Sequence, residues 1–156
     1  MNLCYKNVKI YQDGLPNCGI EEKIVNDVAK KGSKNHQLII KLVEKGANLI
    51  GTEYPKLLIE EYKTIRDTLL PVPARQTGSK TKKTDKYRRK TEEHLSRRDK
   101  YISKRIDETL KDNETGILFI GMMHKVNTFF PNSQRYKDRF LKNSSVNLKT
   151  LSNRSG

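Results

Sequence analysis

Three side chains able to bind a metal ion or move a proton each come just after a short segment of strand-like sequence. Asp13 follows NVKIYQ, Glu53 follows NLIGT, and His124 comes shortly after the apolar run ILFIG. A histidine with two carboxylates suits Mn²⁺, Zn²⁺ or a similar divalent ion, which activates water for hydrolysis. Without a metal, a carboxylate beside a histidine acts as a general base pair. These residues are therefore the candidate catalytic group, with His124 and Glu53 as candidate metal ligands.

Each of the three residues also has a structural interpretation. Asp13 lies in DGLP, where aspartate before glycine is common in turns. Glu53 precedes a helical pattern, where a carboxylate stabilises the helix N-terminus. His124 ends a buried segment and is either a hydrogen-bonded structural residue or a functional one. The sequence leaves both interpretations open for all three.

Three further residues are candidates for the same site. Arg98 lies four residues before Ile102, so we expect it on the inner face of a helix, where it supplies a balancing positive charge or pairs with a nearby carboxylate. Asn35 and His36 follow Ser33, a candidate N-cap, and fall in the first turn of a helix. We expect these two to approach the site as substrate-binding residues, or to serve only in capping.

The elements that must position these residues follow from apolar periodicity. Helical patterns over 20–31, 33–45, 57–69 and 95–110 alternate with strand-like segments at 7–12, 48–52 and 117–121. Strands separated by helices need crossover connections, which predict a parallel sheet covered on both faces. Binding sites of such sheets lie beyond the carboxyl ends of the strands. We therefore expect an α/β fold with a small, mostly parallel sheet flanked by helices and the candidate residues at one edge.

The chain is expected to form one domain over residues 1–126. Residues 127–156 are polar and show no convincing further strand, which predicts a poorly ordered tail. A sheet of three short strands leaves exposed edges, so we also expect a homodimer.

Positive charge is concentrated in one part of the chain. The formal net charge is +14, and residues 73–105 contain thirteen Lys and Arg against four Asp and Glu. The beginning of this segment, about 73–91, is poor in apolar residues and predicts a flexible basic insertion. The alternative function is therefore a non-enzymatic module that binds nucleic acid or another polyanion through residues 80–105. The candidate contacts are Lys82, Lys83, Arg88 and Arg89.

Other sequence signals exclude more than they identify. The two cysteines, Cys4 and Cys18, have no disulfide-framework or metal-knuckle spacing. No segment approaches the roughly 20 apolar residues of a membrane helix, and the N-terminus has no apolar signal region. We expect a cytoplasmic protein without a membrane partner. The catalytic hypothesis implies a small-molecule or peptide substrate, but no nucleotide-binding or nucleophile motif is present.

Several stretches resemble a known group of sequences. YQDGLP, KGSKNHQL, GTE, RRDKYI and GILFIGMMH, spread over residues 10–126, are similar to motifs of an uncharacterised bacterial family. More distantly, the layout resembles the superfamily of TraB/PrgY/Tiki proteins, ChaN and erythromycin esterase. Gly51-Thr52-Glu53 is similar to the strand of that superfamily that ends in Glu, and the Gly121–His124 segment to its Gly-x-x-His element.

This resemblance implies a metal-assisted hydrolase or a ligand-binding relative. Glu53 and His124 would be site residues, and Arg97 or Arg98 would be the helix arginine. Such proteins carry a histidine motif directly after the first strand, where this chain has Asp13 followed by Gly-Leu-Pro.

Overall fold

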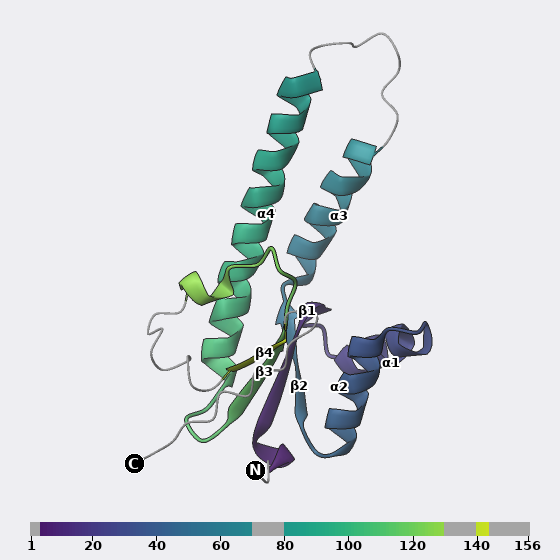
Figure 1. The fold of residues 1–156 in the computed structure, drawn as a ribbon, viewed down its shortest axis with the longest axis vertical. Coiled ribbons are helices and arrows are strands. Elements are labelled where there is room, and N and C mark those ends of the chain that lie inside the picture. The colour runs from purple at the N-terminus through teal and green to yellow at the C-terminus, as the bar shows by residue number, and fades with distance from the viewer. Residues whose placement is uncertain (1–3, 70–79, 130–139, 144–156) are drawn as a thin grey trace.

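The computed structural model describes residues 4–69, 80–129 and 140–143 (Figure 1). They form an α/β fold in which one sheet lies between helices that cover its two faces. The elements in chain order are η1 (Tyr5–Asn7), β1 (Val8–Pro16), α1 (Glu21–Lys30), α2 (Lys34–Glu44), β2 (Asn48–Glu53), α3 (Pro55–Leu69), α4 (Lys80–Thr109), β3 (Thr115–Phe119), η2 (Val126–Phe129) and β4 (Phe140–Asn143).

The sheet is parallel, with strand order β2-β1-β3-β4. Tyr11 of β1 lies between Ile50 of β2 and Leu118 of β3 in the register, so the carboxyl ends of β2, β1 and β3 meet at one edge. The prediction of a small parallel sheet flanked by helices is confirmed.

Apolar side chains form one core on each face of the sheet. Ile10 and Phe119 face α1 and α2, where they pack with Val25 and Ile39. Tyr11 and Leu118 point to the opposite face and pack against Ile102 and Ile106 of α4 and against Leu110, which follows that helix. Because both faces are covered, β3 is apolar from Ile117 to Phe119 instead of alternating with polar residues.

Helices α3 and α4 extend well beyond the sheet as a two-helix hairpin (Figure 1). The sequence predicts a flexible basic insertion over about 73–91, but α4 is helical from Lys80 onward. Residues 70–79 lie outside the described part of the chain. The first half of α4 has no apolar stripe because it stands beyond the sheet and covers no core. Exposed ion pairs of Arg88 with Asp85 and Glu92 support the helix there instead.

The sheet is wider than the sequence predicts. Phe140–Asn143, within the expected polar tail, forms β4 and pairs with β3, so the expectation of no further strand after His124 was wrong. A four-residue strand carries too short a pattern to be recognised by alternation alone. Residues 130–139 and 144–156 of that segment lie outside the described part. None of the helices in the described ranges is both long and apolar enough to cross a membrane.

Candidate functional site

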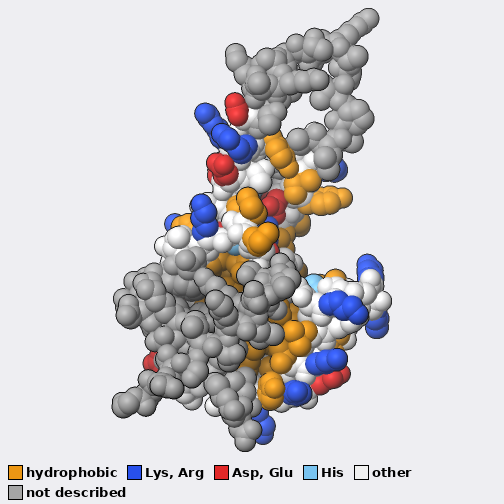
Figure 2. All heavy atoms as spheres, in the orientation of Figure 1, with side chains coloured by type: hydrophobic (Ala, Val, Ile, Leu, Met, Phe, Trp, Pro, Cys, Tyr) orange, Lys and Arg blue, Asp and Glu red, His pale blue; other side chains and the backbone are white. Residues whose placement is uncertain are grey.

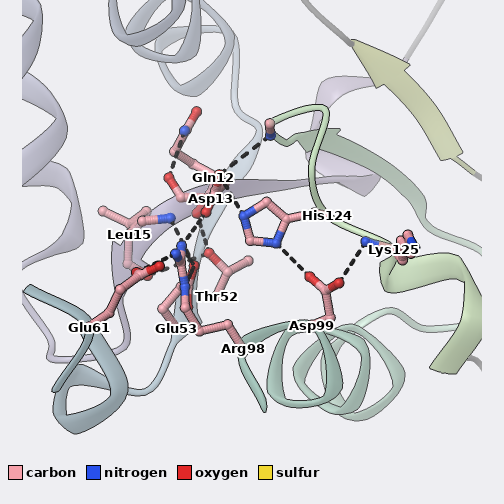
Figure 3. A network of polar contacts seen from close by, with 12 residues as sticks. Gln12, Asp13, Leu15, Thr52, Glu53, Glu61, Arg98, Asp99, His124 and Lys125 are labelled. Atoms are coloured by element: carbon pink, nitrogen blue, oxygen red, sulfur yellow. Dashed lines mark hydrogen bonds and ion pairs between the residues drawn. The ribbon is translucent and has the colours of Figure 1, made fainter. Parts of the chain in front are cut away.

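A network of charged side chains lies at the carboxyl edge of the sheet (Figure 3). Asp13 comes from β1, Glu53 from the end of β2, Arg98 from α4 and His124 from the loop after β3. The sequence predicts all four as site residues, and the structure brings them together although Asp13 and His124 are 111 residues apart in the chain. They are joined by Asp99 of α4 and Glu61 of α3.

Arg98 lies at the centre of three carboxylates. Its Nε donates to both oxygens of Glu53, at 3.1 and 2.9 Å, and its two terminal nitrogens reach Asp13 Oδ1 at 2.5 Å and Glu61 Oε2 at 2.6 Å. The side chain of Glu53 is fully buried and that of Arg98 is 10% exposed. The planar guanidinium can hold several carboxylates at once, which a lysine ammonium cannot do in the same geometry.

His124 is held on both ring nitrogens. Its Nδ1 lies 2.5 Å from Asp99 Oδ1, and its Nε2 lies 3.1 Å from Asp13 Oδ2. The backbone N–H of Lys125 donates to Asp99 Oδ2 at 2.6 Å, so Asp99 is itself fixed in position. Asp99 and His124 are 3% and 5% exposed at the side chain, whereas Asp13 is 21% exposed. Solvent therefore reaches this chain of contacts chiefly at Asp13.

The backbone around Asp13 and Glu53 explains how the two carboxylates meet. The pairing of β1 with β2 is irregular between Gln12 and Pro16, so Asp13 lies in a distorted part of the strand rather than at its end. Gly14 has φ of 77°, a conformation that favours glycine, and its N–H donates to Glu53 Oε1 at 3.0 Å. At Gly51, an added Cβ would lie 2.5 Å from Asn17 Cα, so only glycine lets β2 pass so close to the chain after β1.

The network shifts the pKa values of Asp13 and His124, which are in contact, in opposite directions. Burial raises the pKa of Asp13, but the hydrogen bond and charge of His124 together with Arg98 outweigh it and lower that pKa to about 2. Burial disfavours the charged form of His124, but Asp13 and Asp99 outweigh it, so the pKa of His124 is raised above its ordinary value. Asp13 is therefore held ionised while His124 is held protonated.

Glu53 and Arg98 form the more deeply buried part of the network. Burial raises the pKa of Glu53, against the opposing effect of its hydrogen bonds to Arg98. Burial disfavours the charge of Arg98, but the hydrogen bond and charge of Glu53, with those of Asp13 and Glu61, raise its pKa further. Arg98 is thus a permanent cation within a mostly acidic group.

Two members of the network were not recognised from the sequence. Glu61 lies four residues after Leu57 and four before Ile65, so it interrupts the apolar positions of α3. Asp99 lies three residues before Ile102 and shares the inner face of α4 with it. A carboxylate at an apolar helical position was the available signal for both, because such a group needs a buried partner.

The predicted substrate-binding residues, Asn35 and His36, lie in the first turn of α2 and make no hydrogen bond with the charged network in the described part of the chain. His36 Nδ1 is 2.8 Å from Ser33 Oγ, and burial lowers the pKa of His36. Ser33 is the N-cap residue of α2, but its side chain contacts His36 instead of a backbone N–H. Asn35 is exposed on the same turn. His36 therefore contacts the N-cap residue without a side-chain hydrogen bond from that residue to the helix backbone, and the hydrogen bonds of the charged network include neither His36 nor Asn35.

The predicted nucleic-acid contacts are all on α4. Lys82 and Lys83 lie in its first turn, Arg88 is engaged with Asp85 and Glu92, and Arg89 is exposed. Arg88 and Arg89 lie on a surface separate from the charged network, whereas Arg98 of the same helix enters the network.

The candidate metal ligands do not fit a metal in this arrangement. Both oxygens of Glu53 accept hydrogen bonds from Arg98, and both nitrogens of His124 contact carboxylates. Within residues 4–69, 80–129 and 140–143, no group of three or more His, Cys, Asp or Glu side chains is arranged to hold a metal ion. The position that a divalent cation would need between the carboxylates is taken by the Arg98 guanidinium.

Comparisons with known proteins give no relative for this chain. No protein-family model, no curated protein and no solved structure matches it. The resemblance to the superfamily of TraB/PrgY/Tiki proteins, ChaN and erythromycin esterase therefore stays a prediction, and the function has to be argued from the site itself.

Proposed function

We propose that the protein is a hydrolase-like enzyme in which His124 and Asp13 form an acid–base pair at the carboxyl edge of the sheet. The observation that carries the proposal is the line of contacts from Asp99 through His124 to Asp13, with the most exposed member at its outer end. Adjacent titratable groups whose pKa values are pushed apart take separate acid and base roles.

Asp99 acts on the orientation of the imidazole. It contacts Nδ1 and is held by the Lys125 N–H, so the ring presents Nε2 to Asp13 and to anything that binds beside it. A histidine whose Nδ1 side is fixed by a carboxylate keeps one tautomer and one orientation. Asp99 is therefore a positioning residue in this scheme.

The proton transfers follow from the ionisation states. The Asp13 carboxylate accepts a proton from water as the oxygen of that water bonds to the scissile carbon or phosphorus. His124 donates its Nε2 proton to the leaving atom as the bond to it breaks. Asp13 is then protonated and His124 neutral, and the 3.1 Å contact between them returns the proton to His124. The pair is restored without another group.

Arg98 keeps the base ionised and in place. One terminal nitrogen contacts Asp13 Oδ1, which leaves Oδ2 for His124 and for solvent. The superfamily resemblance would add a divalent metal as an activator of water, but the ligand atoms are engaged by Arg98 and by hydrogen bonds. No step of the proposed reaction depends on a metal, and we expect activity to persist with a chelator present.

The test is a screen of chromogenic carboxylic esters, phosphoesters and amides with wild-type protein and two variants. For the substrate that is turned over, His124→Gln and Asp13→Asn should each lower kcat/KM by about 100-fold or more, the usual size of acid–base catalysis. His94→Gln is the matched control, because His94 contacts Thr64 in the hairpin instead of the network. Full activity in both site variants, with circular dichroism unchanged, would contradict the proposal.

A further inference from the structure

The outer face of α4 carries a row of basic residues. Its members whose side chains the structure describes share this face with Glu93: Arg89, Lys90, Arg97, Lys100 and Lys104. At 3.6 residues per turn their spacing places them on one side of the helix. From Arg89 to Lys104 the row extends along about 22 Å of helix.

The buried residues of α4 lie on the side of the helix opposite to the row. Arg98, Ile102 and Ile106 face the sheet and the charged network. His94 contacts Thr64, and Arg97 contacts Glu60, so α3 lies along one flank. The basic row is centred opposite to the buried side. Figure 2 shows Lys and Arg side chains on the α4 side of the projecting hairpin, with some acidic ones beside them.

Charges are segregated around α4. Of the four acidic residues between 80 and 105, only Glu93 falls within the row. Asp85 and Glu92 lie on another side and pair with Arg88, while Asp99 is buried against His124. Arg89, Lys90 and Lys100 are exposed. Within the row, Arg97 pairs with Glu60 and Lys104 with Glu108, whereas Arg89, Lys90 and Lys100 have no ion pair within the described residues. An anionic partner would balance these three charges.

We propose that this face of α4, called the basic face, binds the phosphate backbone of nucleic acid without sequence preference. Successive turns of this face rise by about 5.4 Å along the helix, so a chain of phosphates can contact several of its basic residues at once. A membrane-surface helix would need large apolar residues beside its basic ones. The exposed apolar residues of the hairpin lie instead on α3, at Ile59, Tyr62 and Ile65. The basic face is separate from the acid–base pair, so this proposal does not rest on the proposed enzymatic activity.

The experiment is a fluorescence-anisotropy titration of a labelled 20-nucleotide single strand and a 20-base-pair duplex of mixed sequence. The full chain is used at salt concentrations from 50 to 300 mM. The face variant replaces Arg89, Lys90 and Lys100 by Gln. The control variant replaces Lys23, Lys30 and Lys41 by Gln, three exposed residues on α1 and α2. Both variants have the same net charge, and Gln keeps a helix propensity close to that of Lys and Arg.

Wild-type affinity should fall steeply with salt. The face variant should bind at least tenfold more weakly at 100 mM salt, and its slope of log affinity against log salt should be smaller by about two to three, since each lost phosphate contact removes about 0.7–0.9. The control variant should stay within about twofold of wild type. Absent binding at 50 mM salt, or equal weakening in both variants, would overturn the proposal. So would binding only to vesicles containing one-third phosphatidylserine, run in parallel.

Discussion

At the scale of single residues, the candidate site depends most on Arg98. It connects carboxylates from β1, β2 and α3, and one of them, Glu53, is fully buried. Removing a partner from a buried ion pair leaves an uncompensated charge, whereas removing an exposed pair changes stability little. Arg97 and Arg98 are neighbours with these two different environments, so they make a matched pair for a test.

Arg98→Met should lower the free energy of unfolding by about 3–5 kcal/mol, because Glu53 then stays buried without its cation. Arg97→Met should lower it by at most about 1 kcal/mol, since Arg97 is 47% exposed and has a surface contact with Glu60. Urea denaturation followed by circular dichroism measures both. Equal effects of the two substitutions would show that the buried network does not stabilise the fold.

Site residues can be predicted from the sequence where the pattern shows that they follow a strand. Asp13, Glu53 and His124 follow strand-like segments, and a parallel sheet has to bring such ends together. Asn35 and His36 take no part in the hydrogen bonds of the charged network, and their position in the first turn of a helix does not fix the direction of their side chains. Asp99 and Glu61 were missed because a helical pattern shows which face is buried but not which helix it meets.

At the scale of elements, α4 combines two different environments in one helix. Its second half packs Ile102 and Ile106 against Tyr11 and Leu118 of the sheet. Its first half covers no core, and its sequence therefore lacks the apolar period from which a helix is predicted. The helical propensity of Lys and Arg and the pairs around Arg88 support this half, and neither signal is distinguishable from an exposed loop in one sequence.

Ile106→Ala should lower the free energy of unfolding by about 2–5 kcal/mol, because Ile106 is fully buried and its removal leaves a cavity. Ile59→Ala on α3 should change it by less than about 1 kcal/mol, since Ile59 is 54% exposed. Thermal or urea unfolding of the two variants compares them directly. A large loss for Ile59→Ala would show that the outer side of α3 is covered in solution, for example in the predicted homodimer.

At the scale of the whole molecule, the charged network joins the sheet to α3 and α4. It contacts β1, β2, α3, α4 and the loop after β3, so its ionisation should be visible in the stability of the entire chain. Protonation equilibria that differ between the folded and unfolded states make the free energy of unfolding depend on pH. Asp13 and His124 have opposite shifts and should act at opposite ends of the pH range.

Asp13 stabilises the folded state above its ordinary pKa of 3.8, and this contribution is lost as pH falls through about 2. Its size is about 2 kcal/mol. In urea denaturation from pH 2 to 6, the pH-dependent part of the difference between wild type and Asp13→Asn should therefore grow from near zero to about that value. Glu53, whose pKa is raised, has the opposite sign. Because Asp13 is one of the groups that raise the pKa of Glu53, the difference between the two proteins reports Asp13 together with its effect on Glu53.

His124 should determine how the free energy of unfolding changes with pH in the alkaline range. Its pKa is raised in the folded state, so its contribution is complete below the ordinary pKa of 6.5 and is lost as pH rises through the higher folded value. The stability advantage of wild type over His124→Gln should shrink between pH 6.5 and 9. An NMR titration of His124 measures the pKa directly. Asp99→Asn should lower the His124 pKa, because the ring then has Asp13 as its remaining carboxylate partner. An unchanged His124 pKa in that variant would show that the Asp99 contact does not support the charged imidazole, and the acid role proposed for His124 would lose its physical basis.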